Sequence, residues 1–381
     1  MHHITSLGLL LISTACAATT AFTPTDQVPL LGPSFLSNFD PTDSTAIKSA
    51  RDSFPEAIDA LFESNELNKT DLVFAVDVFS AATNKSIYNY YHVGEGKNET
   101  LTSGCLNDKT IARIGSVSKL FTAYAIIAKA GIEVFSHPVT KYLPELACNS
   151  SGSPLEHVRW EDVTIGALAS QQAGSGGVAG LLVSTEQPKE LQPRDLFDFV
   201  CAKHPVISPN RVAVYSDGGL AILGQVSARL SEQEYEDVIR EILVKPLGLD
   251  STSLKAPNGS DLNAIDTRPV AETSTFANDI PIVEGSGGFY TSGANLRTVA
   301  SEWHCILVEL VGAPWEIQRL AIPTTPGSNR TRVSDLYTKA GGTGDYNAIF
   351  DLSPDHGIGF SILVTGSTSP SARFTIRDVL G

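Results

Sequence analysis

The spacing of apolar and polar residues changes along this chain, and the changes predict where strands and helices lie. Between residues 71 and 94, a mostly apolar run from Val73 to Phe79 breaks at Ala-Ala-Thr-Asn-Lys and resumes as an aromatic-rich run. This pattern is typical of two strands joined as a hairpin. Strand-like runs return only near the end of the chain, at 336–342, 346–353 and 357–366.

The remaining segments have helical spacing. Residues 44–64 predict a helix that Ser44 caps, and the stretch 136–270 contains helix-like segments joined by loops. Strands at both ends that enclose a helical middle predict an α+β fold: one antiparallel sheet flanked by helices, with an inserted all-helical subdomain. The predicted parts are a signal peptide (1–21), a lead-in with a helix (22–70), a sheet subdomain (71–135 and 271–381) and a helical subdomain (136–270).

The first 21 residues have the pattern of an export signal. A Met-His-His start precedes a short apolar core, and small residues lead to Ala21. This core is too short to span a bilayer, so we expect a secreted mature protein without a membrane span. Six Asn-X-Ser/Thr triplets fit a glycosylated protein from a eukaryote. Their asparagines are Asn68, Asn84, Asn98, Asn149, Asn258 and Asn329.

Charge and cysteine content exclude several classes of protein. The 381 residues include 27 basic and 42 acidic ones, a net charge of -15, and no basic cluster is present that would neutralise the phosphates of a nucleic acid. No cysteine or histidine has zinc-site spacing, so we predict neither a metal nor a cofactor. Beyond the signal, four cysteines allow three pairings, of which we expect one or two bridges: Cys105, Cys148, Cys201 and Cys305.

Candidate chemistry begins at residues 112–121, Ala-Arg-Ile-Gly-Ser-Val-Ser-Lys-Leu-Phe, where Ser116, Ser118 and Lys119 stand at the start of a strongly apolar helix. A lysine in the first turn of a packed helix loses hydration and opposes the helix dipole, and both effects lower its pKa. Ser116 lies three residues before it, on the same face. The two side chains therefore suit a nucleophile and its base. Alternatively, Ser116 caps the helix and Lys119 snorkels.

Two later segments favour the catalytic interpretation. Tyr215, Ser216 and Asp217 precede an apolar helix, and a Lys-Ala-Gly run starts at Lys339 on a late strand. An ordered S-x-x-K, S-D-N or Y-x-N, and K-T-G set is the signature of serine β-lactamases and penicillin-binding proteins. The chain resembles this superfamily in its class C-like branch, and within it the secreted β-lactamase-like proteins of fungi. The segments that carry the resemblance are IGSVSKLFTAYAI, YSDGGLAILG, GGFYTSGANL and YTKAGGTGDYNAIFDLSPDHGIGFSILV.

The resemblance implies the fold of that superfamily, a small-molecule substrate and a role for each matching residue. Ser116 would be the acylated nucleophile, and Lys119 would be its proton partner. Tyr215 would pass a proton to the leaving group. Lys339 would bind a substrate carboxylate, and the backbone N–H groups of Ser116 and Gly342 would form the oxyanion hole. The residues expected to contact substrate are Asp217, Lys339, Gly341 and Gly342.

Three departures from the family pattern affect these expectations. Asp217 stands in place of asparagine, and an ionised Asp217 only accepts hydrogen bonds; it could pair with Lys119 and hold it charged, which weakens the base. The same segment can also be read in the S-D-N register, as Ser216-Asp217-Gly218. Ala340 replaces a threonine whose hydroxyl would contact a substrate carboxylate, which disfavours ordinary β-lactams. Only residues 372–380 remain for a C-terminal helix, so we expect that helix to be short or absent.

The sequence therefore predicts a secreted serine hydrolase or acyltransferase that forms an acyl-Ser116 intermediate from an ester, thioester, amide or lactam. Two alternatives remain open at this stage. One is a catalytically weakened or inactive relative that keeps the fold for binding. The other is a tailoring enzyme in fungal secondary metabolism.

Overall fold

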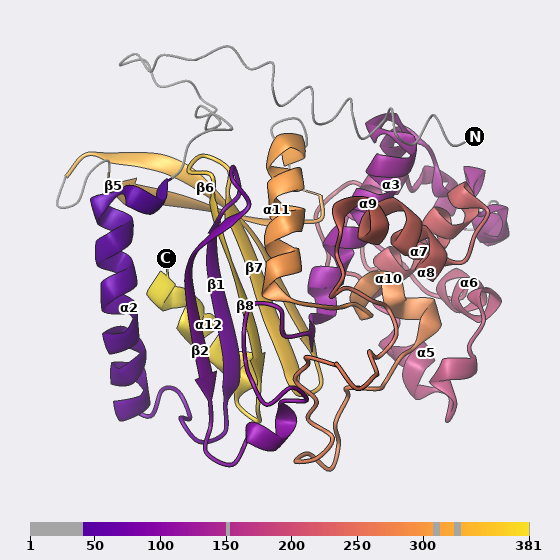
Figure 1. Cartoon of the computed structure of the whole chain (residues 1–381). Helices are drawn as coiled ribbons and strands as arrows, with labels where there is room; N and C mark the ends of the chain where they lie inside the picture. The colour runs from indigo at the N-terminus through magenta and orange to yellow at the C-terminus, as the bar shows by residue number, and fades with distance from the viewer. Residues whose placement is uncertain (1–40, 150–152, 308–312, 324–328, 381) are drawn as a thin grey trace.

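The computed structural model describes residues 41–380 except 150–152, 308–312 and 324–328, with the backbone alone at 149 and 303–307 (Figure 1). Its centre is a six-stranded antiparallel sheet in the order β2-β1-β8-β7-β6-β5. The strands are β1 (Val73–Ser80), β2 (Lys85–Val93), β5 (Glu316–Pro323), β6 (Thr331–Thr343), β7 (Tyr346–Ser353) and β8 (Ile358–Thr365). A separate pair joins β3 (Ala112–Arg113) to β4 (Tyr290–Thr291).

Strands from the two ends of the chain meet inside the sheet. In the β1–β8 pair, Val73 lies opposite Thr365 and Ser80 lies opposite Ile358, while β1 and β2 form the expected hairpin. The predicted class, an antiparallel sheet built from both ends and flanked by helices, is confirmed. The sequence analysis missed β5. Most positions of that strand are exposed, so its segment lacks the strand-like run that predicted the others.

One face of the sheet is covered by α2 (Thr45–Glu63) and α12 (Ser369–Leu380) (Figure 1). The Ser44 hydroxyl accepts a hydrogen bond from the N–H of Ile47 at 3.2 Å, as expected of an N-cap. The expectation of a short or absent last helix was wrong. α12 has 12 residues, and Ala372 and Ile376 bury one stripe against the sheet because they lie four residues apart.

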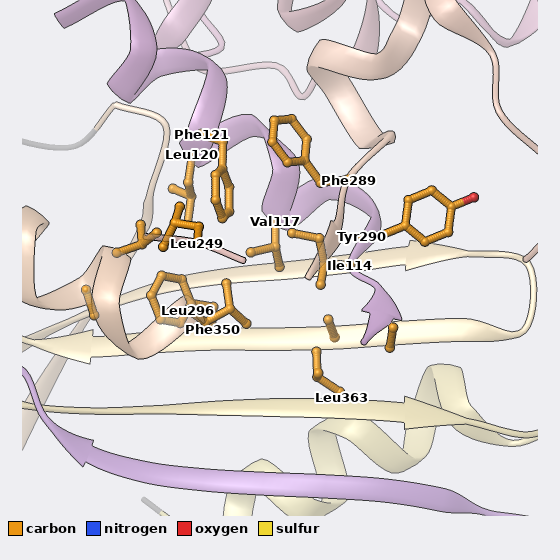
Figure 2. Packing of buried hydrophobic residues seen from close by; sticks show 14 of the residues in the cluster. Ile114, Val117, Leu120, Phe121, Leu249, Phe289, Tyr290, Leu296, Phe350 and Leu363 are labelled. Atoms are coloured by element: carbon orange, nitrogen blue, oxygen red, sulfur yellow. The ribbon is translucent and has the colours of Figure 1, made fainter. Parts of the chain in front are cut away.

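The opposite face packs against α3 (Ser118–Ala130) and α11 (Gly293–Leu307). Figure 2 shows Val117, Leu120 and Phe121 of the α3 region lying with Phe289 above Phe350 of the sheet. These side chains are buried. The burial fixes the start of α3 against the sheet, and this start carries the candidate nucleophile.

A second core holds the helical region together beside the sheet. It gathers buried side chains such as Trp160, Leu168 and Leu220. Its main helices are α4 (Ile165–Ala169), α5 (Ala179–Val183), α6 (Pro193–Cys201) and α7 (Asp217–Ser231), and further helices follow in α8 (Tyr235–Ile239), a π-turn η9 (Arg240–Val244), α9 (Lys245–Leu247) and α10 (Glu284–Gly287). The 3-10 turns are η1 (Pro41–Asp43), η2 (Asn98–Thr100), η3 (Gly115–Val117), η4 (Ile132–Ser136), η5 (Val139–Lys141), η6 (Pro144–Asn149), η7 (Trp160–Asp162), η8 (Pro188–Glu190) and η10 (Pro281–Val283).

A disulfide joins Cys148 to Cys201 within this helical region, in keeping with the expected one or two bridges. Cys105 is free and exposed, and the side chain of Cys305 lies outside the described residues. The predicted signal peptide also falls outside them. None of the helices in the described part of the chain is long and apolar enough to cross a membrane.

Candidate active site

The turn before α3 lies directly against strand β6. A side chain on Gly341 would overlap the carbonyl oxygen of Ile114, and its Cβ would stand 2.9 Å from the nitrogen of Ser116. Gly115 has a φ of 48°, and a Cβ there would overlap the backbone of Gly342. Only glycine permits such an approach. The close contact brings the backbone of Gly342 beside the nucleophile turn, as the predicted oxyanion hole requires.

Ser116 and Lys119 lie within hydrogen-bonding distance, as predicted. The Nζ of Lys119 donates to the Oγ of Ser116 at 2.9 Å and to the carbonyl of Ser286 on α10 at 2.7 Å. The side chain of Lys119 is 0% exposed. The neighbouring Ser118 has a structural role, because its hydroxyl donates to the carbonyl of Gly115 at 2.5 Å and so braces the turn.

Asp217, the first residue of α7, forms an ion pair with Lys119. The distance from Oδ1 to Nζ is 2.6 Å, and the Asp217 side chain is 49% exposed. Burial lowers the pKa of Lys119 below its usual value, and the Asp217 carboxylate opposes this effect. The pairing that the sequence analysis considered for these two residues is therefore present. It limits how readily Lys119 becomes neutral.

Tyr215 lies between the two lysines of the site. The Nζ of Lys119 is 4.9 Å from the centroid of its ring, and the Nζ of Lys339 is 5.0 Å from it. Burial raises the pKa of Tyr215, while Lys339 and a hydrogen bond with Ser116 oppose this effect. Ser216 is buried, and its hydroxyl accepts a hydrogen bond from Gly219 at 2.9 Å as the cap of α7. This placement favours the tyrosine register over the S-D-N register.

Lys339 is paired with a carboxylate that the sequence analysis missed. Its Nζ donates to Oε1 of Glu316 at 2.9 Å and to the carbonyl of Ala340 at 2.9 Å. Glu316 lies on β5 and faces Thr338 across the β5–β6 ladder. The residues from 308 to 330 gave no strand signal, so nothing in the sequence placed Glu316 beside Lys339.

Ala340 lies elsewhere than the sequence analysis assumed. Its side chain packs against the cluster on the α2 and α12 side of the sheet, and it lines neither cavity of the site. A threonine at position 340 would therefore not place its hydroxyl in either cavity of this protein. The residues of this strand pair that bear on carboxylate binding are Lys339 and Glu316.

Two cavities adjoin the catalytic candidates. One, of about 220 Å³, contains Ser116, Asp217 and Gly342 in its wall together with apolar side chains. The other, of about 440 Å³, contains Tyr215 and Glu316. Their remaining lining residues include Arg113, Val178, Leu182, Asn278, Ile280 and Val283 in the first, and Gln171, Ala213, Trp315 and Ile317 in the second. Ser116 thus borders one cavity and Tyr215 borders the other.

Comparison with known proteins agrees with this arrangement. Residues 81–380 match the family model described as Beta-lactamase. The chain belongs to the beta-lactamase family. The resemblance inferred from its motifs is confirmed at the level of this superfamily.

This beta-lactamase family member is similar to fungal proteins named as hydrolases. It is 22% identical to Probable hydrolase clz13 of Cochliobolus lunatus, over 94% of this chain and 65% of that protein. It is 23% identical to Probable hydrolase M10 of a Phoma species, over 85% of this chain and 59% of that protein. The chain thus spans about 60% of the length of these curated relatives. A class C beta-lactamase shares its fold with a TM-score of 0.63 at 18% identity, over 89% of this chain and 97% of that one.

A second residue that sequence reasoning missed comes from the last helix. Arg373 of α12 donates a hydrogen bond to the carbonyl of Gly341, beside the glycine pair of the K-T-G-like strand. Burial lowers its pKa, and the charge of Glu316 opposes this effect. Because the sequence analysis expected little or no C-terminal helix, it had no reason to assign Arg373 to the site of this family member.

Proposed function

We propose that this protein is a serine hydrolase or acyltransferase that acts on an ester, thioester, amide or lactam through an acyl-Ser116 intermediate. The observation that carries the proposal is the 2.9 Å hydrogen bond between Ser116 and a lysine that has no exposed surface. A buried amine beside a hydroxyl is suited to accept its proton, because burial disfavours the charged form of the amine.

In the proposed reaction, the Oγ of Ser116 attacks the substrate carbonyl carbon, and its proton passes to the neutral Nζ of Lys119. The N–H groups of Ser116 and Gly342 stabilise the oxyanion that forms. The bond between the carbonyl carbon and the leaving group then breaks, and the hydroxyl of Tyr215 supplies the proton that the leaving group needs. Water, or another acceptor that carries a proton, then attacks the acyl-serine and gives its proton to the Tyr215 phenolate. The bond between the acyl carbon and the Ser116 oxygen breaks, and the proton held on Lys119 returns to that oxygen.

A fluorophosphonate probe tests the proposal directly, because it bonds covalently only to an activated serine. Intact-protein mass spectrometry is expected to show one adduct, and peptide mapping is expected to place it on Ser116. Ser116→Ala should abolish the adduct, whereas Ser118→Ala, which removes a hydroxyl two residues away, should retain some labelling. Labelling that persists in Ser116→Ala would contradict the proposal.

The Lys119–Asp217 ion pair favours a second candidate, a relative with weakened catalysis that keeps the fold for binding. If Asp217 holds Lys119 protonated at all accessible pH values, Ser116 has no base. Turnover of no substrate in an ester and thioester panel, with Asp217→Asn equally silent, would support this candidate. Turnover by the wild-type protein would exclude it, whereas turnover by Asp217→Asn alone would show that Asp217 is what silences Lys119.

We also propose that the protein is exported and glycosylated, and that it serves in fungal secondary metabolism. Five of the six sequon asparagines have exposed side chains in the described part of the chain: Asn68, Asn84, Asn98, Asn258 and Asn329. The side chain of Asn149 lies outside the described residues. Expression in a secreting fungus should give a medium-borne protein whose mass falls on treatment with an N-glycosidase. A protein retained in the cell without glycan would contradict this, and a neighbouring synthase gene would support the metabolic role.

A further inference from the structure

The carboxylate of Glu316 lies at the edge of a cavity and is paired with a buried lysine. It lies 2.9 Å from the Nζ of Lys339, with 54% of its side chain exposed, whereas Lys339 is 2% exposed. It also lines the larger cavity next to Tyr215. Glu316 lines the cavity and Lys339 does not, so an approaching molecule would meet the carboxylate before the ammonium group.

Arg373 adds a second cation to the same place. Its guanidinium donates to the carbonyl of Gly341, and its Nε is buried without a hydrogen-bond partner within the described residues. Arg373 and Glu316 interact electrostatically. The Glu316 carboxylate thus interacts with both Lys339, which is buried, and Arg373, which is half-buried, on the β6 side of the site. Glu316 forms an ion pair with Lys339 and lies within electrostatic reach of Arg373, so it stands where these cations would attract an anion.

We propose that Glu316 fills the anion-binding position of this site and thereby selects acyl donors whose leaving group carries no carboxylate. The inference rests on the proposed acyl-Ser116 chemistry. Tyr215 delivers the leaving-group proton and lines the larger cavity, so the leaving group enters on the Glu316 side. A carboxylate on that group would have to displace Glu316 or lie beside it, and juxtaposed like charges are strongly unfavourable.

The walls of this cavity suit a neutral leaving group. Trp315, Ala213 and Ile317 offer apolar surface, and the Nε2 of Gln171 is buried and has no partner within the described residues. Gln171 lines the same cavity, so its amide provides a donor for a carbonyl or hydroxyl oxygen. A neutral aryl or alkyl alcohol, or a neutral thiol, matches this lining better than an amino acid carboxylate does.

The test uses three phenylacetyl esters that differ only in the charge of the leaving group: 3-hydroxybenzoate, 3-hydroxybenzamide and 3-(aminomethyl)phenol. Each kcat/KM is divided by the rate constant of uncatalysed alkaline hydrolysis of the same ester, which corrects for intrinsic reactivity. The wild-type protein should prefer the neutral benzamide ester over the benzoate ester by at least about tenfold. The cationic ester should be used at least as well as the neutral one.

Glu316→Gln keeps the shape of the side chain and removes its charge. It should raise kcat/KM for the benzoate ester, relative to the benzamide ester, by about tenfold. Adding Arg373→Met should reverse part of this gain. Glu241→Gln is the matched control, because Glu241 is also a half-exposed glutamate paired with a lysine, Lys245 at 2.6 Å, but lines neither cavity; the ratio should not change.

Salt provides a measurement that needs no variant. Raising the ionic strength from about 10 mM to about 500 mM screens exposed charges and should increase the relative use of the benzoate ester by the wild type. A wild type that uses both esters equally, or a Glu316→Gln variant with an unchanged ratio, would overturn the inference and leave the acyl-serine mechanism standing. If no ester acylates Ser116, the proposed function and the inference both fail.

Discussion

Lys119 and Lys339 have nearly the same surroundings, but their remaining hydrogen bonds differ. Each side chain is almost fully buried, each pairs with a carboxylate that is about half exposed, and each stands about 5 Å from the ring of Tyr215. Lys119 also donates to the hydroxyl of Ser116. Lys339 instead donates to the carbonyl of its own strand.

This difference indicates that the remaining hydrogen bonds of a buried lysine, more than its ion pair, decide its role. Lys119 can exchange a proton with the nucleophile, because one of its three partners is a hydroxyl. The described partners of Lys339 are a carboxylate and a carbonyl, which only accept. Lys339 is therefore placed to act as a fixed cation. Five substitutions test the contrast.

Lys119→Met should have the largest effect. It removes the base while roughly preserving the volume of the side chain, so kcat/KM for a neutral phenyl ester is expected to fall by at least about 10³-fold. Lys339→Met should lower it by only about tenfold, because the neutral ester makes no ion pair with that residue. Thermal unfolding of both variants provides the control for folding. Equal losses from the two substitutions would contradict the proposed division of roles.

Gly341→Ala should disturb both lysines, because Gly341 holds β6 against the nucleophile turn. The added methyl group would overlap the carbonyl of Ile114, and the resulting shift of the oxyanion site should lower kcat/KM by about 10²-fold. Gly177→Ala is the matched control, since its Cβ would meet nothing within 4 Å. An active Gly341→Ala protein with unchanged melting temperature would show that the contact is not needed.

Glu284→Gln tests the stability of α10, the helix whose backbone binds Lys119. The described hydrogen bonds of Lys339 include none to this helix. Glu284 begins the helix whose Ser286 carbonyl binds Lys119. Burial raises the pKa of Glu284 to about 8, with Glu236 and Asp279 adding to the rise and Lys255 opposing it. Between pH 4.5 and 8 the folded protein therefore holds a proton that the unfolded chain releases, so stability falls as pH rises through this window.

At pH 8.5, Glu284→Gln should raise the free energy of unfolding by about 4 kcal/mol, as measured by urea denaturation. At about pH 4 the wild type and the variant should be nearly equal, because the glutamate is then largely protonated in both states. A difference between them that does not depend on pH would refute the assignment of the raised pKa to Glu284.

Asp217→Asn should have the smallest effect and the most specific one. The Asp217 carboxylate raises the pKa of Lys119 against the effect of burial, so its removal lowers that pKa. Because Lys119 acts as a base only when neutral, the acidic limb of the kcat/KM profile should move to lower pH. If the limb moves by one pH unit, kcat/KM at a fixed pH on that limb rises about tenfold. Glu316→Gln should move it less, and a limb that moves to higher pH would contradict the base role of Lys119.

The sequence was sufficient to place the elements that carry a strong local pattern. The Ser116–Lys119 spacing places both side chains on one face of a helix start, and apolar or aromatic strand-like runs placed β1, β2 and the late strands. Tyr215 and Lys339 required the family resemblance, because nothing local relates residues that are about 100 positions or more apart. In the structure these four side chains are brought together.

Glu316 and Arg373 escaped prediction for physical reasons. Glu316 lies on an edge strand with little burial, so its segment has no strand-like run, and its contact with Lys339 depends on the register between two strands. Arg373 lies on α12, whose apolar stripe is only a few residues wide. Ala340 was misplaced because a strand directs neighbouring side chains to opposite faces, and only the structure shows which face borders the cleft.

The position of β1 beside β8 has a consequence for synthesis on the ribosome. Residue 73 pairs with residue 365, so the β1–β2 hairpin keeps an open edge until residue 365 has emerged. Contacts so distant in sequence form slowly and leave unpaired edges open to wrong partners. Ser116 meets Gly341 and Gly342 only at that late stage. A nascent chain that stalls before β6 would carry Ser116 without the backbone of Gly342 beside it, and under the proposed mechanism it would not react.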